Sequence, residues 1–231
     1  MGMMFNRRRV CGGKIDPYAK YTLIHHWEAS DGIVNGGWID RIQGKVLTAY
    51  GNPQLVDGMF KLKALDVNFQ ANLNSDIPVN MGNVWQVDVE FLVESVPSEK
   101  ASYLVDFGSL YMVNHAFGFS VSVDSKILHN PKLTGNNSAA LYETGIPFSS
   151  YGVLSKASMG MEKIDDTTYL PYYLLNGERY NSPNTTTERG ATFNGNFNQN
   201  VLYIGRGHST ELRYQSSDWK YIKSLKIYKK E

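Results

Sequence analysis

Two carboxylates share one face of the clearest strand that the sequence predicts. Asp88 and Glu90 are two residues apart, and Glu94 continues the same face. In an extended strand this spacing sets Asp88 and Glu90 about 6.5–7 Å apart. Glycoside hydrolysis uses two carboxylates separated by about 5–9.5 Å, one of which must stay protonated. A hydrolase is therefore one hypothesis, and an ordinary polar strand face is the interpretation that we favour.

The other reactive residue types do not form a catalytic pattern. Cys11 is the only cysteine, which excludes an internal disulfide and a thiolate metal cluster. The sequence has no G-x-S-x-G motif of the kind that presents a nucleophilic serine. His25 and His26 are adjacent, so in a strand they point to opposite faces and cannot ligate one metal from the same side. We expect no catalytic residues, no enzyme activity and no cofactor.

Aromatic residues near predicted loops offer a different chemistry, the binding of glycans. Exposed rings stack on sugars, and amides bind hydroxyl groups. The candidates for this role are Trp38, Tyr111, Asn114, Tyr151 and Tyr180. Trp27 and Trp85 alternate with polar neighbours inside predicted strands, and we assign both to the core.

Alternating patterns predict the elements that would position these residues. From Val84 to Glu94, apolar and polar residues alternate with a period of two, which is typical of a half-buried strand. Asn176-Gly177 predicts a two-residue hairpin turn, because both positions tolerate positive φ. Further strands are expected at 23–28, 45–50, 59–67, 103–107, 119–123, 153–158, 169–175, 201–205 and 219–228. Residues 129–150 and 180–200 are expected to form long loops.

One segment allows two interpretations. Trp219, Ile222, Leu225 and Tyr228 recur every three residues, as in a helical stripe. Ile227 breaks that stripe, and the sequence Leu-Lys-Ile at 225–227 fits a strand, which we favour.

Length and composition support one β-rich domain. The chain has 231 residues, of which 42% are hydrophobic and 19% charged, so it can form a sizeable core. No apolar run approaches the roughly 20 residues of a membrane-spanning helix, and no membrane insertion is expected. The domain shows no helix-turn-helix pattern and no basic face, which argues against the readout of nucleic acid.

Charge is concentrated at the two ends of the chain. Residues 1–20 and 220–231 each carry a net charge of +4, which leaves −7 for the residues between them. Arg7, Arg8 and Arg9 are not followed by the apolar segment of a secretion signal. We therefore expect a protein made in a cytoplasm, with a basic N-terminal arm at 1–21 and one domain at 22–231. The arm would contact an anionic partner, or it would simply be solvated.

The order of motifs over residues 22–228 resembles a known superfamily. Leu-Tyr-Ile-Gly at 202–205 is followed by a closing segment of the form I-x-x-L-x-I-Y at 222–228. This order is similar to the concanavalin A-like, laminin G-like jelly-roll superfamily. The resemblance implies an all-β fold of two stacked antiparallel sheets. It does not fix function, because this fold carries lectins, glycosidases and purely structural modules.

Two details of that superfamily bear on the candidate sites. Its laminarinase-type members carry an E-x-D-x-x-E run, and the order and spacing of Asp88, Glu90 and Glu94 depart from it. The resemblance also implies a structural calcium at the loop edge, held through an aspartate and backbone carbonyls. Candidate ligands are Asp31, Asp40 or Asp57, and the metal ligands stay otherwise unknown.

The N-terminal arm resembles the leaders of bacteriophage and prophage structural proteins. The similarity lies in Phe-Asn-Arg-Arg-Arg at 5–9 and Cys-Gly-Gly-Lys at 11–14. It implies a non-enzymatic virion protein, such as a head fibre, a decoration protein or a tail-associated module, attached through Arg7, Arg8 and Arg9. Its expected partners are other virion proteins and host-surface glycan, in a homo-oligomer that would be a trimer. The alternative is a soluble, carbohydrate-binding, lectin-like module.

Overall fold

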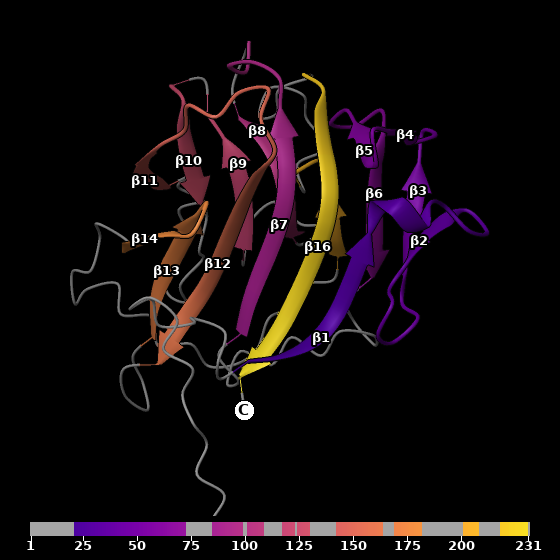
Figure 1. Cartoon of the computed structure of the whole chain (residues 1–231), viewed down its shortest axis with the longest axis horizontal. Helices are drawn as coiled ribbons and strands as arrows, with labels where there is room; N and C mark the ends of the chain where they lie inside the picture. Colours follow the sequence, from indigo (N-terminus) through magenta and orange to yellow (C-terminus); the bar gives the residue numbers. More distant parts are fainter. Residues whose placement is uncertain are drawn as a thin grey trace, which may run out of the picture.

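The chain is described by a computed structural model over residues 21–72, 85–98, 101–108, 117–122, 124–129, 142–163, 169–181, 201–207 and 218–230. In these parts it forms two antiparallel sheets stacked as a sandwich (Figure 1). The expected all-β, jelly-roll-like class is confirmed. A single 3-10 turn, η1 (Ala29–Asp31), joins the first two strands.

The first layer, sheet A, has the strand order β14-β13-β12-β7-β16-β5-β4, with β1 also paired to β16. Its strands are β1 (Tyr21–Glu28), β4 (Gln54–Val56), β5 (Met59–Leu62), β7 (Trp85–Val93), β12 (Ser155–Lys163), β13 (Tyr169–Leu175), β14 (Glu178–Asn181) and β16 (Lys220–Lys230). The second layer, sheet B, has the order β11-β10-β9-β8-β15-β6-β3-β2. Its strands are β2 (Gly37–Ile39), β3 (Val46–Tyr50), β6 (Asn68–Asn72), β8 (Ser102–Gly108), β9 (Phe117–Val121), β10 (Lys126–His129), β11 (Tyr142–Pro147) and β15 (Val201–Ile204).

The last strand, β16, resolves the ambiguity between helix and strand in favour of the strand. It pairs with β7 on one side and with β1 and β5 on the other, so it lies at the centre of sheet A (Figure 1). A bulge lies between Ile222 and Ser224. Because a bulge adds one residue and shifts the alternation, Ile222 and Leu225 both face the core although they are three residues apart. The three-residue spacing of Ile222 and Leu225 in the sequence therefore results from a bulge in a strand, and not from a helix.

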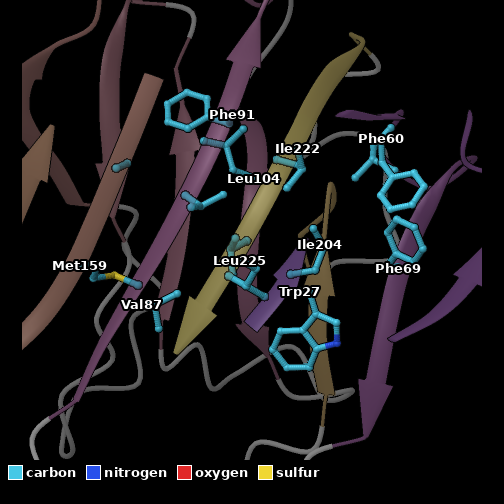
Figure 2. Packing of buried hydrophobic residues seen from close by; sticks show 14 of the residues in the cluster. Trp27, Phe60, Phe69, Val87, Phe91, Leu104, Met159, Ile204, Ile222 and Leu225 are labelled. Carbon is cyan, nitrogen blue, oxygen red and sulfur yellow. The ribbon is translucent and has the colours of Figure 1, made fainter. Parts of the chain in front are cut away.

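The core lies between the two sheets and is rich in aromatic side chains (Figure 2). The rings of Trp38, Phe60 and Phe69 contact one another with centroids 4.9–5.3 Å apart. Trp27 is fully buried, as expected. The Trp85 side chain lies outside the described residues.

Several element boundaries differ from those expected. Residues 59–67 do not form one strand, because the chain turns at 64–66 and passes from β5 in sheet A to β6 in sheet B. Ala64, at the start of this turn, has a positive φ of 33°, which nothing in its residue type indicates. Two regions that we expected to be long loops also contain strand residues. Strands β10 and β11 reach into 129–150, and β14 reaches into 180–200.

The hairpin at Asn176-Gly177 is confirmed. Both residues have positive φ, 50° and 87°, and Leu175 pairs with Glu178 across the turn. This turn fixes the register of β13 and β14, and therefore the position of Arg179 and Tyr180 at the edge of sheet A.

Candidate functional site

The outward face of sheet A carries several contacts between polar side chains of neighbouring strands. Phe91 and Ile222 are register partners and both point into the core. Since side chains alternate along a strand, their neighbours Glu90 and Tyr221 point away from the core, as does Lys61, the partner of Tyr221 on β5. Two groups of residues lie on this face.

The first group, here called the central network, is a chain of polar contacts across β7, β12 and β13. The Tyr172 hydroxyl donates to Gln86 Oε1 at 2.5 Å, and Gln86 Nε2 donates to Asp88 Oδ1 at 2.7 Å. Lys156 Nζ lies 2.8 Å from the other oxygen of Asp88. Burial, reinforced by a hydrogen bond with Tyr21, raises the pKa of Tyr172 far above its ordinary value. The network therefore holds its donors and acceptors in fixed positions.

The second carboxylate of the strand is also held by a lysine. Lys223 Nζ donates to Glu90 Oε2 at 3.1 Å. Burial alone would raise the pKa of Glu90, but Lys223 and, at longer range, Lys226 and Lys156 lower it below its ordinary value. A general acid for glycoside hydrolysis needs a raised pKa instead. With Asp88 paired to Lys156 and Glu90 to Lys223, each of these carboxylates lies beside a cation.

The second group, here called the aromatic corner, lies where β16 begins beside β5. Trp219 is 38% exposed and is followed along the same face by Tyr221. Lys61 Nζ lies 4.7 Å from the centroid of the Trp219 ring and 5.6 Å from that of Tyr221. Lys63 Nζ lies 5.5 Å from the Trp219 ring. The Tyr221 hydroxyl donates to Glu94 Oε1 at 2.7 Å, which fixes the orientation of its ring.

Lys220 separates the two aromatic residues and points the other way. It is fully buried, and its Nζ donates to the Gly205 carbonyl at 3.1 Å. Because Lys220 faces the interior, its neighbours Trp219 and Tyr221 face outward. Burial lowers the pKa of Lys220 to about 7.

Three of the expected glycan-binding residues, Trp38, Tyr151 and Tyr180, lie in the described part of the chain. Trp38 is fully buried and donates its indole N–H to the Glu28 carbonyl, so the expectation of an exposed stacking ring is wrong at this position. Tyr151 is half-buried against Phe148. Tyr180 is half-buried at the edge of sheet A, and a hydrogen bond with Glu178 raises its pKa. Five further expected residues lie outside the described part of the chain: Arg7, Arg8, Arg9, Tyr111 and Asn114.

Two of the three expected calcium ligands are bound by other groups of the protein. Asp31 binds the Arg41 guanidinium through both oxygens, at 2.6 and 2.7 Å. Asp40 is buried and accepts hydrogen bonds on both oxygens, including one of 2.8 Å from His25 Nδ1. Asp57 occupies the turn between β4 and β5. Within the described residues, no three His, Cys, Asp or Glu side chains converge as a metal site.

His25 and His26 point to opposite faces, as expected. His25 is buried with its ring stacked on Trp27 at 5.3 Å, whereas His26 lies 3.2 Å from Glu28 on the outward side. His25 is thus part of the structural support of β1.

Sequence reasoning missed the aromatic corner. A strand with strict alternation places Trp219 and Tyr221 on one face and Lys220 and Ile222 on the other. Lysine side chains are rarely buried, so a lysine on the core side hides the alternation that would have indicated an outward-facing Trp219 and Tyr221. Lys61 of β5 and Lys63, which directly follows β5, contact this corner from a segment distant in sequence.

Comparisons with known proteins show the fold. No protein-family model matches the chain, and no curated protein matches it. The chain is similar to the structure of Trypanosoma rangeli sialidase in complex with the inhibitor DANA, with 12% identity over 89% of this chain and 30% of that one, and a TM-score of 0.61. It is also similar to the binding domain of Botulinum neurotoxin DC in complex with SialylT, with 12% identity over 89% of this chain and 47% of that one, and a TM-score of 0.60.

A second structure of that neurotoxin binding domain, in complex with rat synaptotagmin II, gives 11% identity and a TM-score of 0.58. The chain thus spans between about a third and a half of the length of these structures. At such low identity the likeness defines the class as a β-sandwich. Among the described residues, no helix has the length and apolar character needed to cross a membrane.

Proposed function

We propose that this protein is a lectin-like module that binds glycans on the outward face of sheet A. The observation that carries the proposal is Trp219, a part-exposed indole ring at one end of a face with fixed polar groups. Indole rings stack on the apolar face of a sugar ring, and neighbouring amides, hydroxyls and charged groups bind its hydroxyls. DANA and SialylT, which are in complex with the sialidase and the neurotoxin binding domain, support this choice of ligand class.

Binding without catalysis fits the carboxylates of the central network. Asp88 and Glu90 each lie next to a lysine, at 2.8 and 3.1 Å. Lys223 favours the charged form of Glu90, whereas hydrolysis needs one carboxyl to donate a proton. Gln86 and Tyr172 anchor Asp88 from the other side, and its side chain is only 2% exposed, so Asp88 supports this face from within.

A glycan array followed by titration calorimetry tests the proposal. The wild-type protein is expected to bind a defined set of glycans, and Trp219→Ala is expected to weaken binding by about tenfold, because a lost stacking platform is worth up to about 1.5 kcal/mol beyond the area it buries. Trp219→Phe keeps an aromatic face and should retain part of the affinity. Val153→Ala is the matched control, since Val153 is 59% exposed and lies outside this face. Absence of binding on the array, or equal affinities of Trp219→Ala and wild type, would contradict the proposal.

The virion role stays a separate prediction. It depends on residues 1–20, which lie outside the described residues. A lectin-like module could equally be the glycan-contacting part of a virion protein, so the two hypotheses are compatible.

A further inference from the structure

The aromatic corner combines an apolar platform with two cations. Lys61 Nζ lies within 6 Å of both the Trp219 and the Tyr221 rings, and Lys63 Nζ lies 5.5 Å from Trp219. Tyr221 is held by Glu94 and is the register partner of Lys61. Lys63 directly follows β5, and Trp219 directly precedes β16. The two ammonium groups are therefore placed beside the rings by the sheet itself.

The carboxylates near this corner leave Lys61 without a carboxylate partner in the described part of the chain. Glu94 accepts from Tyr221. Asp66 is paired with Lys63 at 3.5 Å, and its side chain is 67% exposed. Such an exposed pair is weak, so a ligand carboxylate can replace Asp66 at small cost. The corner thus has two ammonium groups available to an incoming anion.

We propose that the aromatic corner selects acidic sugars: Trp219 stacks on the ring of a carboxylated pyranose while Lys61 and Lys63 bind its carboxylate. This inference rests on the proposed glycan-binding function and names the ligand class. A neutral sugar would use the stacking surface alone, whereas a carboxylate adds charge-assisted hydrogen bonds to two cations. Sialic and uronic acids share this chemistry, and the experiment distinguishes them.

Titration calorimetry compares sialyllactose, a glucuronic-acid-terminated disaccharide and lactose, each with the full chain. The wild type is expected to bind at least one acidic sugar more tightly than lactose, and higher salt should narrow the difference. Lys61→Gln combined with Lys63→Gln removes both charges and should lower the affinity for the acidic sugar by about tenfold, with less than about twofold change for lactose. Lys229→Gln, an exposed lysine at the far end of β16, is the matched control and should change neither.

The outcomes separate the inference from the function on which it rests. Equal affinity for acidic and neutral sugars, with both lost in Trp219→Ala, would overturn the acidic preference and leave the glycan-binding function in place. A preference for acidic sugars that survives the double substitution would overturn the role of the two lysines. Binding of no sugar at all would overturn both. The acidic sugar bound more tightly identifies the source, sialic or uronic acid.

Discussion

Lys220 places an amino group in the interior of the sandwich with a single described hydrogen-bond acceptor, the Gly205 carbonyl. An ammonium group carries three donors, so burial penalises the charged form and lowers the pKa to about 7. The pKa of an unfolded lysine is about 10.4. Between these two values the unfolded chain binds more protons than the folded one. Stability therefore rises with pH in this window, and the full penalty of the buried charge is present below it.

Replacing Lys220 with Met should remove this pH dependence. At about pH 6 the variant is expected to be more stable than wild type, because it buries no charge. Between about pH 7 and pH 9 the wild type should gain up to about 1.4 kcal/mol per pH unit relative to Lys220→Met, since one proton separates its two states. Urea unfolding at several pH values measures this difference. Lys229→Met, at an exposed position of the same strand, should follow the wild-type curve, and parallel curves for wild type and Lys220→Met would contradict the argument.

Asp40 is a second buried charge, and here the surroundings favour the charged form. It accepts hydrogen bonds from His25 Nδ1 and from the backbone N–H groups of His26, Ile42 and Gln43, at 2.7–3.0 Å. Burial by itself would raise the pKa of Asp40, but these hydrogen bonds lower it below its ordinary value. The stability it contributes is therefore present above the unfolded pKa of about 3.9 and is lost as the pH falls below that value.

We expect Asp40→Asn to destabilise the fold by about 2–4 kcal/mol at neutral pH, because a single amide oxygen cannot satisfy four donors. The cost should shrink near pH 3, where the wild-type carboxyl is itself being protonated. Asp31→Asn is the control, since Asp31 forms an exposed pair with Arg41 that is worth at most about 1 kcal/mol. Equal unfolding midpoints of Asp40→Asn and Asp31→Asn would contradict the structural role of Asp40.

Residue types alone predicted the buried Trp27 and the opposed histidines, because both follow from alternation along one strand. They did not predict Trp38, which is fully buried although we expected it near a loop. Its burial depends on Phe60 and Phe69, which come from other strands and surround its ring. The exposed Trp219 was missed for the same reason. Burial of an aromatic residue is set by contacts between strands, which spacing in the sequence does not contain.

At the scale of elements, long alternating strands and turn residues were predictable. β7, β13 and the Asn176-Gly177 hairpin match their expected positions closely. The bulge in β16 and the turn at 64–66 were not predictable, because no residue type at either place indicates it. Each of them changes the side to which the following side chains point. Both features matter for the candidate site, since they determine which residues of β16 and β5 face outward.

Two glycines test how tightly the turns are specified. Gly177 and Gly51 both have positive φ, 87° and 72°. An added Cβ at Gly177 meets no atom within 4 Å, whereas at Gly51 it would lie 1.6 Å from the Asp66 carbonyl oxygen. Gly177→Ala should therefore cost only the backbone strain, about 1 kcal/mol, and Gly51→Ala about 3 kcal/mol or more. Urea unfolding of both variants measures the two changes in the free energy of unfolding. Similar values for the two variants would contradict the expected clash and show that the backbone near Asp66 shifts at little cost.

At the scale of the whole molecule, the sandwich is closed by strands from the two ends of the described chain. All of β1, from Tyr21 to Glu28, pairs antiparallel with the second half of β16, and β7 pairs with the opposite edge of β16 (Figure 1). Trp27 brings β1 into the core between the sheets (Figure 2). The resemblance to the jelly-roll superfamily predicted this two-layer arrangement, whereas the partner strands of β1 followed only from the structure.

This closure separates the residues that the fold needs from those that would serve attachment. Deleting residues 1–28 removes β1, with Trp27 and the His26 N–H bound by Asp40, so the truncated chain is expected not to fold. Deleting only residues 1–20 keeps Tyr21, whose hydroxyl contacts Tyr172, and should leave the thermal midpoint within about 2 °C of the full chain. Light scattering then tests the arm with its three arginines. If the basic arm mediates assembly, the full chain forms a larger particle and the shortened chain a smaller one. Identical monomers of both would contradict the attachment hypothesis and leave sugar binding by the sandwich as the remaining function.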